Sequence, residues 1–120
     1  MSAAAQLVLI TCPPAAADAL AGVLVERRLA ACVSILPGLR SVYRWQGAVE
    51  RADETLLIAK TSRAHYPALE ACVREAHPYE LPEIAAVDIA QGLPGWLQWL
   101  ADQLAEPVDC APVPTPSGLP

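Results

Sequence analysis

The sequence predicts an α+β domain in which four strands and two helices follow the order β-α-β-β-α-β, with one more helix at the end. Three observations predict it: short runs rich in Leu, Val and Ile, stretches with apolar residues at helical spacing, and prolines between them. The chain has 120 residues, 54% of them hydrophobic, which is enough to bury the core of a single domain. The order of elements is that of a ferredoxin-like βαββαβ sandwich.

The first strand and the first helix are separated by a proline pair. Residues 6–12 form a short apolar run that ends at Pro13-Pro14, which is typical of a buried strand. Residues 15–28 then carry apolar side chains at helical spacing, at Ala16, Leu20, Val23 and Leu24. We expect Arg27 and Arg28 in the last turn, where positive charge suits the helix dipole.

Two long strand candidates follow, at residues 31–45 and 48–61, joined by a Gln46-Gly47 turn. At about 3.3 Å per residue, each would run roughly 45 Å, whereas a domain of this size has a radius of gyration of about 13 Å. Pro37-Gly38 predicts a bend within the first of them. A hairpin of this length would project from its own domain with apolar residues on both faces, so it requires a partner.

Prolines also divide the second half of the chain. Pro67 opens a helix over residues 67–76, and Pro78 ends it. A fourth strand is expected over residues 83–90, and Pro94 opens the extra C-terminal helix. We therefore predict a folded domain over residues 1–106 and a proline-rich mobile tail over residues 107–120.

Composition excludes several classes of partner. The net charge of −5 argues against binding to nucleic acid or to an anionic membrane surface, because both require a basic face. No apolar run is long enough to span a membrane, and the N-terminus lacks the segments of a signal peptide. The four cysteines, at positions 12, 32, 72 and 110, form no CxxC pair. Free thiols in the reducing cytoplasm are the expectation.

The densest group of chemically active side chains is His77-Pro78-Tyr79-Glu80-Leu81-Pro82-Glu83. Two prolines stiffen a segment that carries an imidazole, a phenol and carboxylates, which suits a binding site. The alternative is that the prolines only shape a connection from helix to strand. We expect His65, in a polar context, to be a solvated surface residue.

No catalytic motif is present. The chain lacks a Gly-rich phosphate loop, HExxH and GxSxG. Cys32 and His77 could form a nucleophile pair, but nothing supplies a third group to orient them. Cysteine and histidine are also ligands for copper or zinc, although the spacing of these residues favours no local metal site. We therefore expect a protein without catalytic turnover.

Several blocks of sequence together resemble the CutA divalent-cation tolerance proteins. They extend over about residues 6–104, and each alone would be a weak signal. The blocks are Leu29-Ala30-Ala31-Cys32-Val33-Ser34, Ser41-Val42-Tyr43-Arg44-Trp45-Gln46-Gly47, Glu54, Lys60-Thr61, His77-Pro78-Tyr79-Glu80-Leu81-Pro82-Glu83-Ile84 and Trp96-Leu97-Gln98-Trp99.

The resemblance implies a compact homotrimer with interwoven hairpins, a link to copper tolerance, and an architecture similar to the PII signalling trimers. It implies that the metal candidates are Cys32, His77 and Glu83, with copper or another divalent ion as the ligand. It also implies an intersubunit ligand cleft whose residues are Tyr43, Trp45, Glu54, Lys60 and Tyr79. Two departures from the family pattern are Ser34, where Asn is commoner, and Thr11, which takes the place of a cysteine found in some members.

Three hypotheses follow. The first is a trimeric copper-binding or metal-tolerance protein. The second is a PII-like regulatory trimer that binds a small anionic ligand in the intersubunit cleft, using Lys60 and the hairpin arginines. The third is a structural scaffold trimer whose shared residues serve only packing at the interface.

Overall fold

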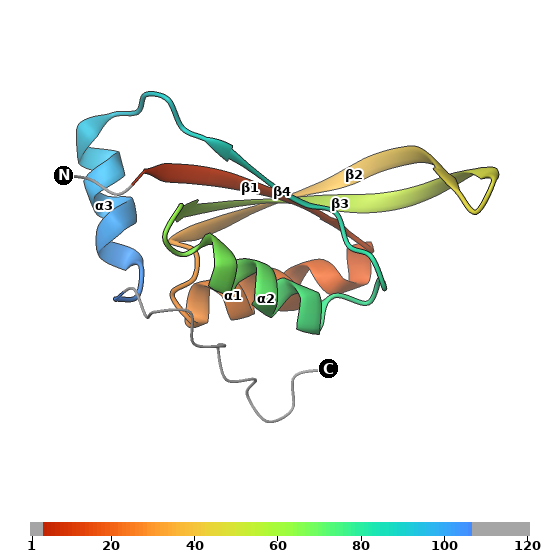
Figure 1. Cartoon of the computed structure of the whole chain (residues 1–120), viewed down its shortest axis with the longest axis horizontal. Coiled ribbons are helices and arrows are strands. Elements are labelled where there is room, and N and C mark those ends of the chain that lie inside the picture. The colour runs from red at the N-terminus through yellow and green to blue at the C-terminus, as the bar shows by residue number, and fades with distance from the viewer. Residues whose placement is uncertain (1–3, 107–120) are drawn as a thin grey trace.

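The computed structural model describes residues 4–106 and confirms the α+β architecture with an additional C-terminal helix (Figure 1). The strands and helices are β1 (Ala5–Cys12), α1 (Ala17–Glu26), β2 (Cys32–Trp45), β3 (Ala48–Ser62), α2 (Tyr66–Ala76), β4 (Ile84–Asp88) and α3 (Pro94–Gln103). The predicted tail, with Cys110, lies outside the described residues.

The four strands form one antiparallel sheet in the order β2-β3-β1-β4. Helices α1 and α2 lie side by side on one face of this sheet, which is the layering of a ferredoxin-like sandwich (Figure 1). Helix α3 packs near the start of β1 and the end of β3. Within residues 4–106, no helix covers the opposite face of the sheet (Figure 1).

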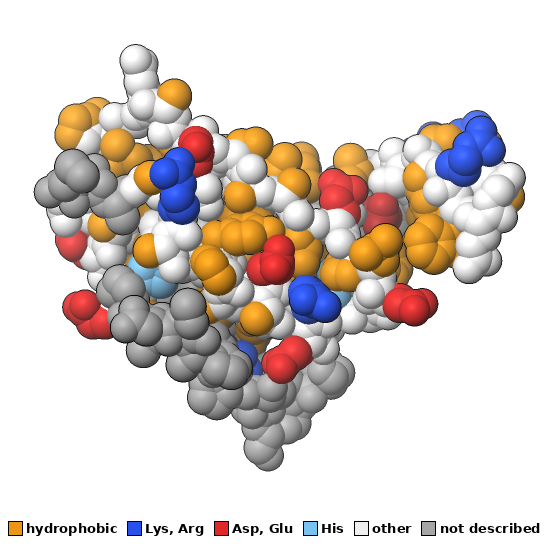
Figure 2. All heavy atoms as spheres, in the orientation of Figure 1, with side chains coloured by type: hydrophobic (Ala, Val, Ile, Leu, Met, Phe, Trp, Pro, Cys, Tyr) orange, Lys and Arg blue, Asp and Glu red, His pale blue; other side chains and the backbone are white. Residues whose placement is uncertain are grey.

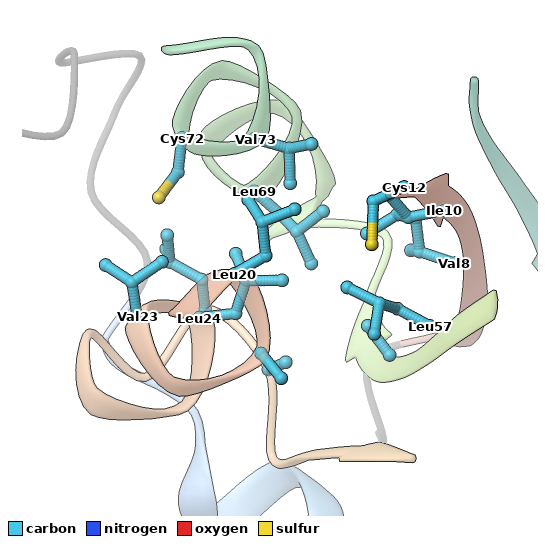
Figure 3. Packing of buried hydrophobic residues seen from close by; sticks show 14 of the residues in the cluster. Val8, Ile10, Cys12, Leu20, Val23, Leu24, Leu57, Leu69, Cys72 and Val73 are labelled. Atoms are coloured by element: carbon cyan, nitrogen blue, oxygen red, sulfur yellow. The ribbon is translucent and has the colours of Figure 1, made fainter. Parts of the chain in front are cut away.

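The hydrophobic core lies between the sheet and the two helices. In β1, Val8 and Ile10 are fully buried whereas Leu7 and Leu9 are only partly buried, because successive side chains in a strand point to opposite faces. Each buried Leu, Ile or Val side chain stabilises the fold by about 1.5–3 kcal/mol. The other buried residues of this layer include Leu20 and Leu24 of α1, Leu57 of β3, and Leu69 and Val73 of α2 (Figure 3).

The hairpin turn is the two-residue turn that the sequence predicted. Gln46 and Gly47 have φ angles of 49° and 83°. Positive φ at both positions is typical of a type I′ turn, whose twist matches that of the two strands it joins. The predicted bend is a β-bulge, in which Pro37 and Gly38 together face Thr55, and Gly38 has a φ of 85°.

The hairpin projects from the body of the molecule, as its length predicted (Figure 1). No residue of β2 is buried, and neither is any residue of β3 from Ala48 to Asp53. Large apolar side chains on the hairpin are exposed, among them Val42 at 56% and Val49 at 59%. The apolar surface of this element therefore lacks a partner within the described part of one chain.

The end of α1 differs from the prediction. The helix stops at Glu26, so Arg27 is its C-cap and Arg28 lies beyond it with a φ of 58°. The Leu29 N–H donates to the Leu24 carbonyl at 2.9 Å. The Arg28 N–H donates to the Val25 carbonyl at 3.0 Å. This is a Schellman motif with arginine where glycine is usual.

Arg28, in its left-handed conformation, contacts the last residue of α3 and the segment that follows it. Its Nη1 donates to the Gln103 carbonyl at 3.3 Å, and its own carbonyl accepts the Ala105 N–H at 3.0 Å. Helix propensity could not reveal this, because the partners lie more than 70 residues away. The start of α1 also differs, since Pro14–Ala16 forms a short 3-10 turn.

The expectation for His65 was wrong. Its side chain is only 9% exposed, and both ring nitrogens have close partners. The Ser62 Oγ lies 2.6 Å from Nδ1, and the Ala105 carbonyl oxygen lies 2.6 Å from Nε2. Because a carbonyl can only accept, Nε2 carries the proton. His65 thus fastens the segment after α3 to the start of α2.

Candidate functional site

A cavity of about 660 Å³ lies where the hairpin leaves the body. Acidic side chains occur along the base of the hairpin, and basic ones near its tip (Figure 2). Three sources contribute to the cavity: the end of β1, the hairpin from Glu54 outward to Trp45, and the segment 78–83 between α2 and β4. The lining residues are Thr11, Ser41, Val42, Tyr43, Trp45, Glu54, Pro78, Tyr79, Glu80, Leu81 and Glu83.

His77 holds the segment 78–83 against β1. Its Nε2 lies 2.7 Å from the Thr11 carbonyl oxygen and donates to it, while Nδ1 accepts the Tyr79 N–H at 3.0 Å. The imidazole is 6% exposed, and its ring centroid lies 4.8 Å from that of Tyr79. Both nitrogens are therefore committed to backbone groups, so His77 positions the loop that carries the cavity residues.

Tyr79 joins this loop to β3 across the cavity. Its hydroxyl donates to Glu54 Oε2 at 3.0 Å, and the Glu54 side chain is buried. Desolvation of the hydroxyl, followed by its bond to Glu54, raises the pKa of Tyr79 to about 12. The phenol consequently remains a neutral donor that fixes the direction of the carboxylate.

A second carboxylate is oriented on the β1 side. Thr11 Oγ1 donates to Glu83 Oε1 at 3.3 Å, although the rest of Glu83 is exposed. Glu80 lines the same cavity, which brings three carboxylates to it. None of the described residues that line it is a lysine or an arginine. The cavity therefore has a negative character, which favours a cation over an anion.

The predicted site residues fall into two groups. Tyr43, Trp45, Glu54, Tyr79 and Glu83 all line the cavity, and His77 supports it from beneath the loop. Tyr43 and Trp45 are each 44% exposed, so the hairpin side of the cavity is open.

Cys32 and Lys60 form the other group, at the opposite end of the sheet. They face each other across β2 and β3, and Lys60 in turn pairs with Leu7 of β1. Thr11, which contacts His77 and Glu83, lies four residues further along β1, or roughly 13 Å at about 3.3 Å per residue. One chain therefore does not bring Cys32 and Lys60 to the cavity.

Within residues 4–106, no three His, Cys, Asp or Glu side chains form a group that could hold a metal ion. Cys12 and Cys72 belong to the core (Figure 3). Burial is the main cause that raises the pKa of both thiols, with Glu54 contributing at Cys12. The three described cysteines are free.

Sequence reasoning missed the cavity roles of Thr11 and Ser41. Thr11 was noted only as a departure from the family pattern, and nothing marked Ser41 as a site residue. Thr11 ends the apolar run of the first strand and stands just before buried Cys12. A hydroxyl at the end of a buried strand is a weak signal that could have indicated a residue at the rim of the sheet, facing a cavity.

The fold and the site together define a class: a small ferredoxin-like α+β protein with a projecting hairpin and an acidic, aromatic-lined cavity at its base. No helix among the described residues is long and apolar enough to cross a membrane.

Comparison with known proteins places the chain in one family of this class. The model of the family described as "CutA1 divalent ion tolerance protein" matches residues 6–103. A divalent-cation tolerance protein CutA of Thermus thermophilus is 49% identical over 98 residues, which are 81% of this chain and 95% of that protein. The mouse Protein CutA is 42% identical over 92 residues, 76% of this chain, which spans only about half (52%) of that relative.

Solved structures agree. The divalent cation tolerance protein Cut A1 of Thermus thermophilus has a TM-score of 0.82 at 47% identity, over 84% of this chain and 99% of its own. A protein from Archaeoglobus fulgidus, described as a periplasmic divalent cation tolerance protein CutA, has a TM-score of 0.80 at 34% identity. The match covers 82% of this chain and 97% of that protein. The chain belongs to the CutA1 divalent ion tolerance family.

Proposed function

We propose that this protein binds a divalent metal ion, copper foremost, in metal tolerance, as a homotrimer and without catalytic turnover. The observation that carries this proposal is the set of three glutamates around a cavity whose described lining contains no lysine or arginine. Such a site concentrates cations and repels anions. The family name, which refers to divalent ion tolerance, points to the same class of ligand.

Glu54 and Glu83 are the proposed oxygen ligands. Each accepts a hydrogen bond from a neighbouring hydroxyl, Tyr79 for Glu54 and Thr11 for Glu83. Bonds of this kind orient a ligating carboxylate and commonly change metal affinity by about 10–100-fold when they are lost. The cavity thus offers oriented oxygen donors, which suit a divalent cation.

Copper also favours nitrogen and sulfur ligands. A site that includes a cysteine sulfur requires more than one chain. Cys32 of one copy can meet Glu83 of another only if the copies associate, because the two lie at different ends of a single sheet. His77 can ligate through Nδ1 only if it releases the Tyr79 N–H. We therefore propose an intersubunit metal site with Glu83 and Cys32 as primary ligands.

The alternative of a PII-like trimer that binds a small anionic ligand is less well supported. Lys60 bonds to Ser34 and Cys32, away from the cavity, and no arginine among the described residues lines the cavity. An anion would need basic groups from a second copy. A scaffold trimer would bind neither class of ligand.

Three free cysteines among the described residues support a reducing, cytoplasmic location for this chain. The archaeal relative that is named periplasmic shows that the compartment needs its own test. Fractionation of the native host followed by detection with an antibody would supply it, and a periplasmic signal would refute the cytoplasmic assignment.

Calorimetric titration of the metal-free protein with Cu²⁺, Zn²⁺ and Mg²⁺ tests the main proposal. We expect micromolar or tighter binding of copper, and about tenfold or greater weakening in Glu83→Gln and in Cys32→Ser. Glu50→Gln is the control, because Glu50 lies on the exposed hairpin outside the cavity lining. Unchanged binding in both ligand variants, or tighter binding of an anion such as ATP than of any metal, would overturn the assignment.

A further inference from the structure

Cys32 and Lys60 form an unusual pair at the end of the sheet that lies away from the cavity. They are directly opposite in the antiparallel register of β2 and β3, so their side chains share one face of the sheet. The Lys60 Nζ lies 3.7 Å from the Cys32 Sγ and also bonds to the Ser34 hydroxyl. The Ala31 N–H donates to the Lys60 carbonyl at 2.8 Å, which fixes this register at the end of the strand.

The surroundings of the pair differ from those of an ordinary surface lysine. Among residues 4–106, no carboxylate lies within ion-pair distance of the Lys60 Nζ. Both Cys32 and Lys60 are partly exposed, so small solutes reach them. Cys12 and Cys72 are 0% and 2% exposed, and no lysine amine of the described residues is bonded to either sulfur. Cys32 is thus the accessible thiol of the described part, and it stands beside a potential nucleophile.

From this contact we infer that Cys32 and Lys60 form a covalent, reversible cross-link when the protein meets a peroxide. In the first step, the Cys32 sulfur attacks the peroxide O–O bond, giving a sulfenic acid and one molecule of water. In the second step, the Lys60 amine, having lost one proton to solvent, attacks the sulfur. The S–O bond breaks, an N–S bond forms, and the hydroxyl leaves as water with a second proton from nitrogen.

In the overall reaction, one molecule of peroxide is reduced to two molecules of water. The thiol and the amine are joined by an S–N bond, and together they lose two hydrogens. An added thiol reverses it, because attack on the sulfur releases the amine and leaves a disulfide that a second thiol reduces. This chemistry parallels the known condensation of a sulfenic acid with a backbone nitrogen.

The geometry favours each step. The Cys32 sulfur is partly exposed, so a peroxide can reach it. The strand pairing then holds amine and sulfur together, so the second step is intramolecular and outcompetes external thiols. The product would join β2 to β3 at the end of the sheet away from the cavity. It would also remove Cys32 as a thiolate ligand.

The inference does not depend on the proposed metal function, because its test uses protein freed of metal with a chelator. The Cys110→Ser chain is treated with hydrogen peroxide, and its intact mass is measured before and after addition of dithiothreitol. We expect a loss of two hydrogens that dithiothreitol reverses. Trypsin should also fail to cut after Lys60 in the oxidised sample, where peptides containing Cys32 and Lys60 should remain joined.

Lys60→Arg is the matched control, since it keeps the positive charge but removes the amine. It should gain oxygen at Cys32 and show no loss of two hydrogens. If the two hydrogens are lost equally in Lys60→Arg, a disulfide is responsible and the inference is wrong. Addition of oxygen alone to the chain that retains Lys60, without joined peptides, would also overturn it. Cys12→Ser should behave as the parent does, because that thiol is buried.

Discussion

At the scale of single residues, the contact between Tyr79 and Glu54 defines one wall of the site. Glu54 is 6% exposed and its carboxylate accepts the Tyr79 hydroxyl at 3.0 Å. A buried carboxylate that loses a donor keeps its desolvation cost without the compensating bond. The family resemblance implied that both residues belong to a cleft, but their mutual contact joins residues 25 positions apart and depends on the loop that His77 anchors.

We predict that Tyr79→Phe lowers the free energy of unfolding by about 1–3 kcal/mol, because Glu54 then lacks its partner. The measurement is urea denaturation followed by tryptophan fluorescence. Tyr43→Phe is the control, since Tyr43 lines the same cavity but makes no hydrogen bond through its hydroxyl in the described structure. Equal effects of the two substitutions would show that the bond to Glu54 contributes nothing to stability.

At the scale of elements, the hairpin is shaped by two glycines with positive φ. Gly38 allows the bulge in β2, and Gly47 completes the type I′ turn at the tip. Both positions were indicated by the sequence, because Pro-Gly within a strand and Gln-Gly between two strands are local signals. The segment 78–83 was likewise indicated by its prolines, whereas its attachment to β1 through His77 was not.

We predict that Gly47→Ala destabilises the protein by about 1–2 kcal/mol. The space around Gly47 is open, so the cost arises from the left-handed conformation and not from a clash. Gly22→Ala is the matched control: Gly22 lies inside α1, also in open space, and alanine there should stabilise by about 0.5–1 kcal/mol. Thermal melting of both variants is the measurement, and shifts of the same sign would contradict the conformational explanation.

At the scale of the whole molecule, exposed apolar surface is distributed over the hairpin and the uncovered face of the sheet. Leu36, Val42 and Val49 are all more than half exposed. A soluble monomer seldom leaves such a surface open, and an interface between copies is the usual explanation. The long edge of β2 also presents unpaired backbone groups among the described residues, which favours association.

We predict that the purified protein has the mass of three chains by multi-angle light scattering. Val42→Asp should dissociate it, because a carboxylate would enter an apolar interface. Val25→Asp is the control, since Val25 is 42% exposed and lies on α1, outside the hairpin. A folded monomer at micromolar concentration would refute the trimer and, with it, the intersubunit metal site.

The sequence indicated the order of elements, the hairpin turn, the bulge and the loop that carries Tyr79 and Glu83, because each of these depends on neighbouring residues. The apolar run of β1 and the prolines at element ends are local patterns that physical chemistry reads directly. The family resemblance added the cleft residues. The comparisons confirm the family, while the individual metal ligands remain predictions.

Contacts between distant residues were decided only by the tertiary structure. Its register separates Cys32 and Lys60 from the cavity, and its packing commits both nitrogens of His77 to the backbone and buries His65 against Ala105. A side chain's partner depends on the strand that lies opposite it, and antiparallel pairing can bring together positions far apart in the chain. The same imidazole is a ligand or an anchor according to what surrounds it, and its surroundings exist only after folding.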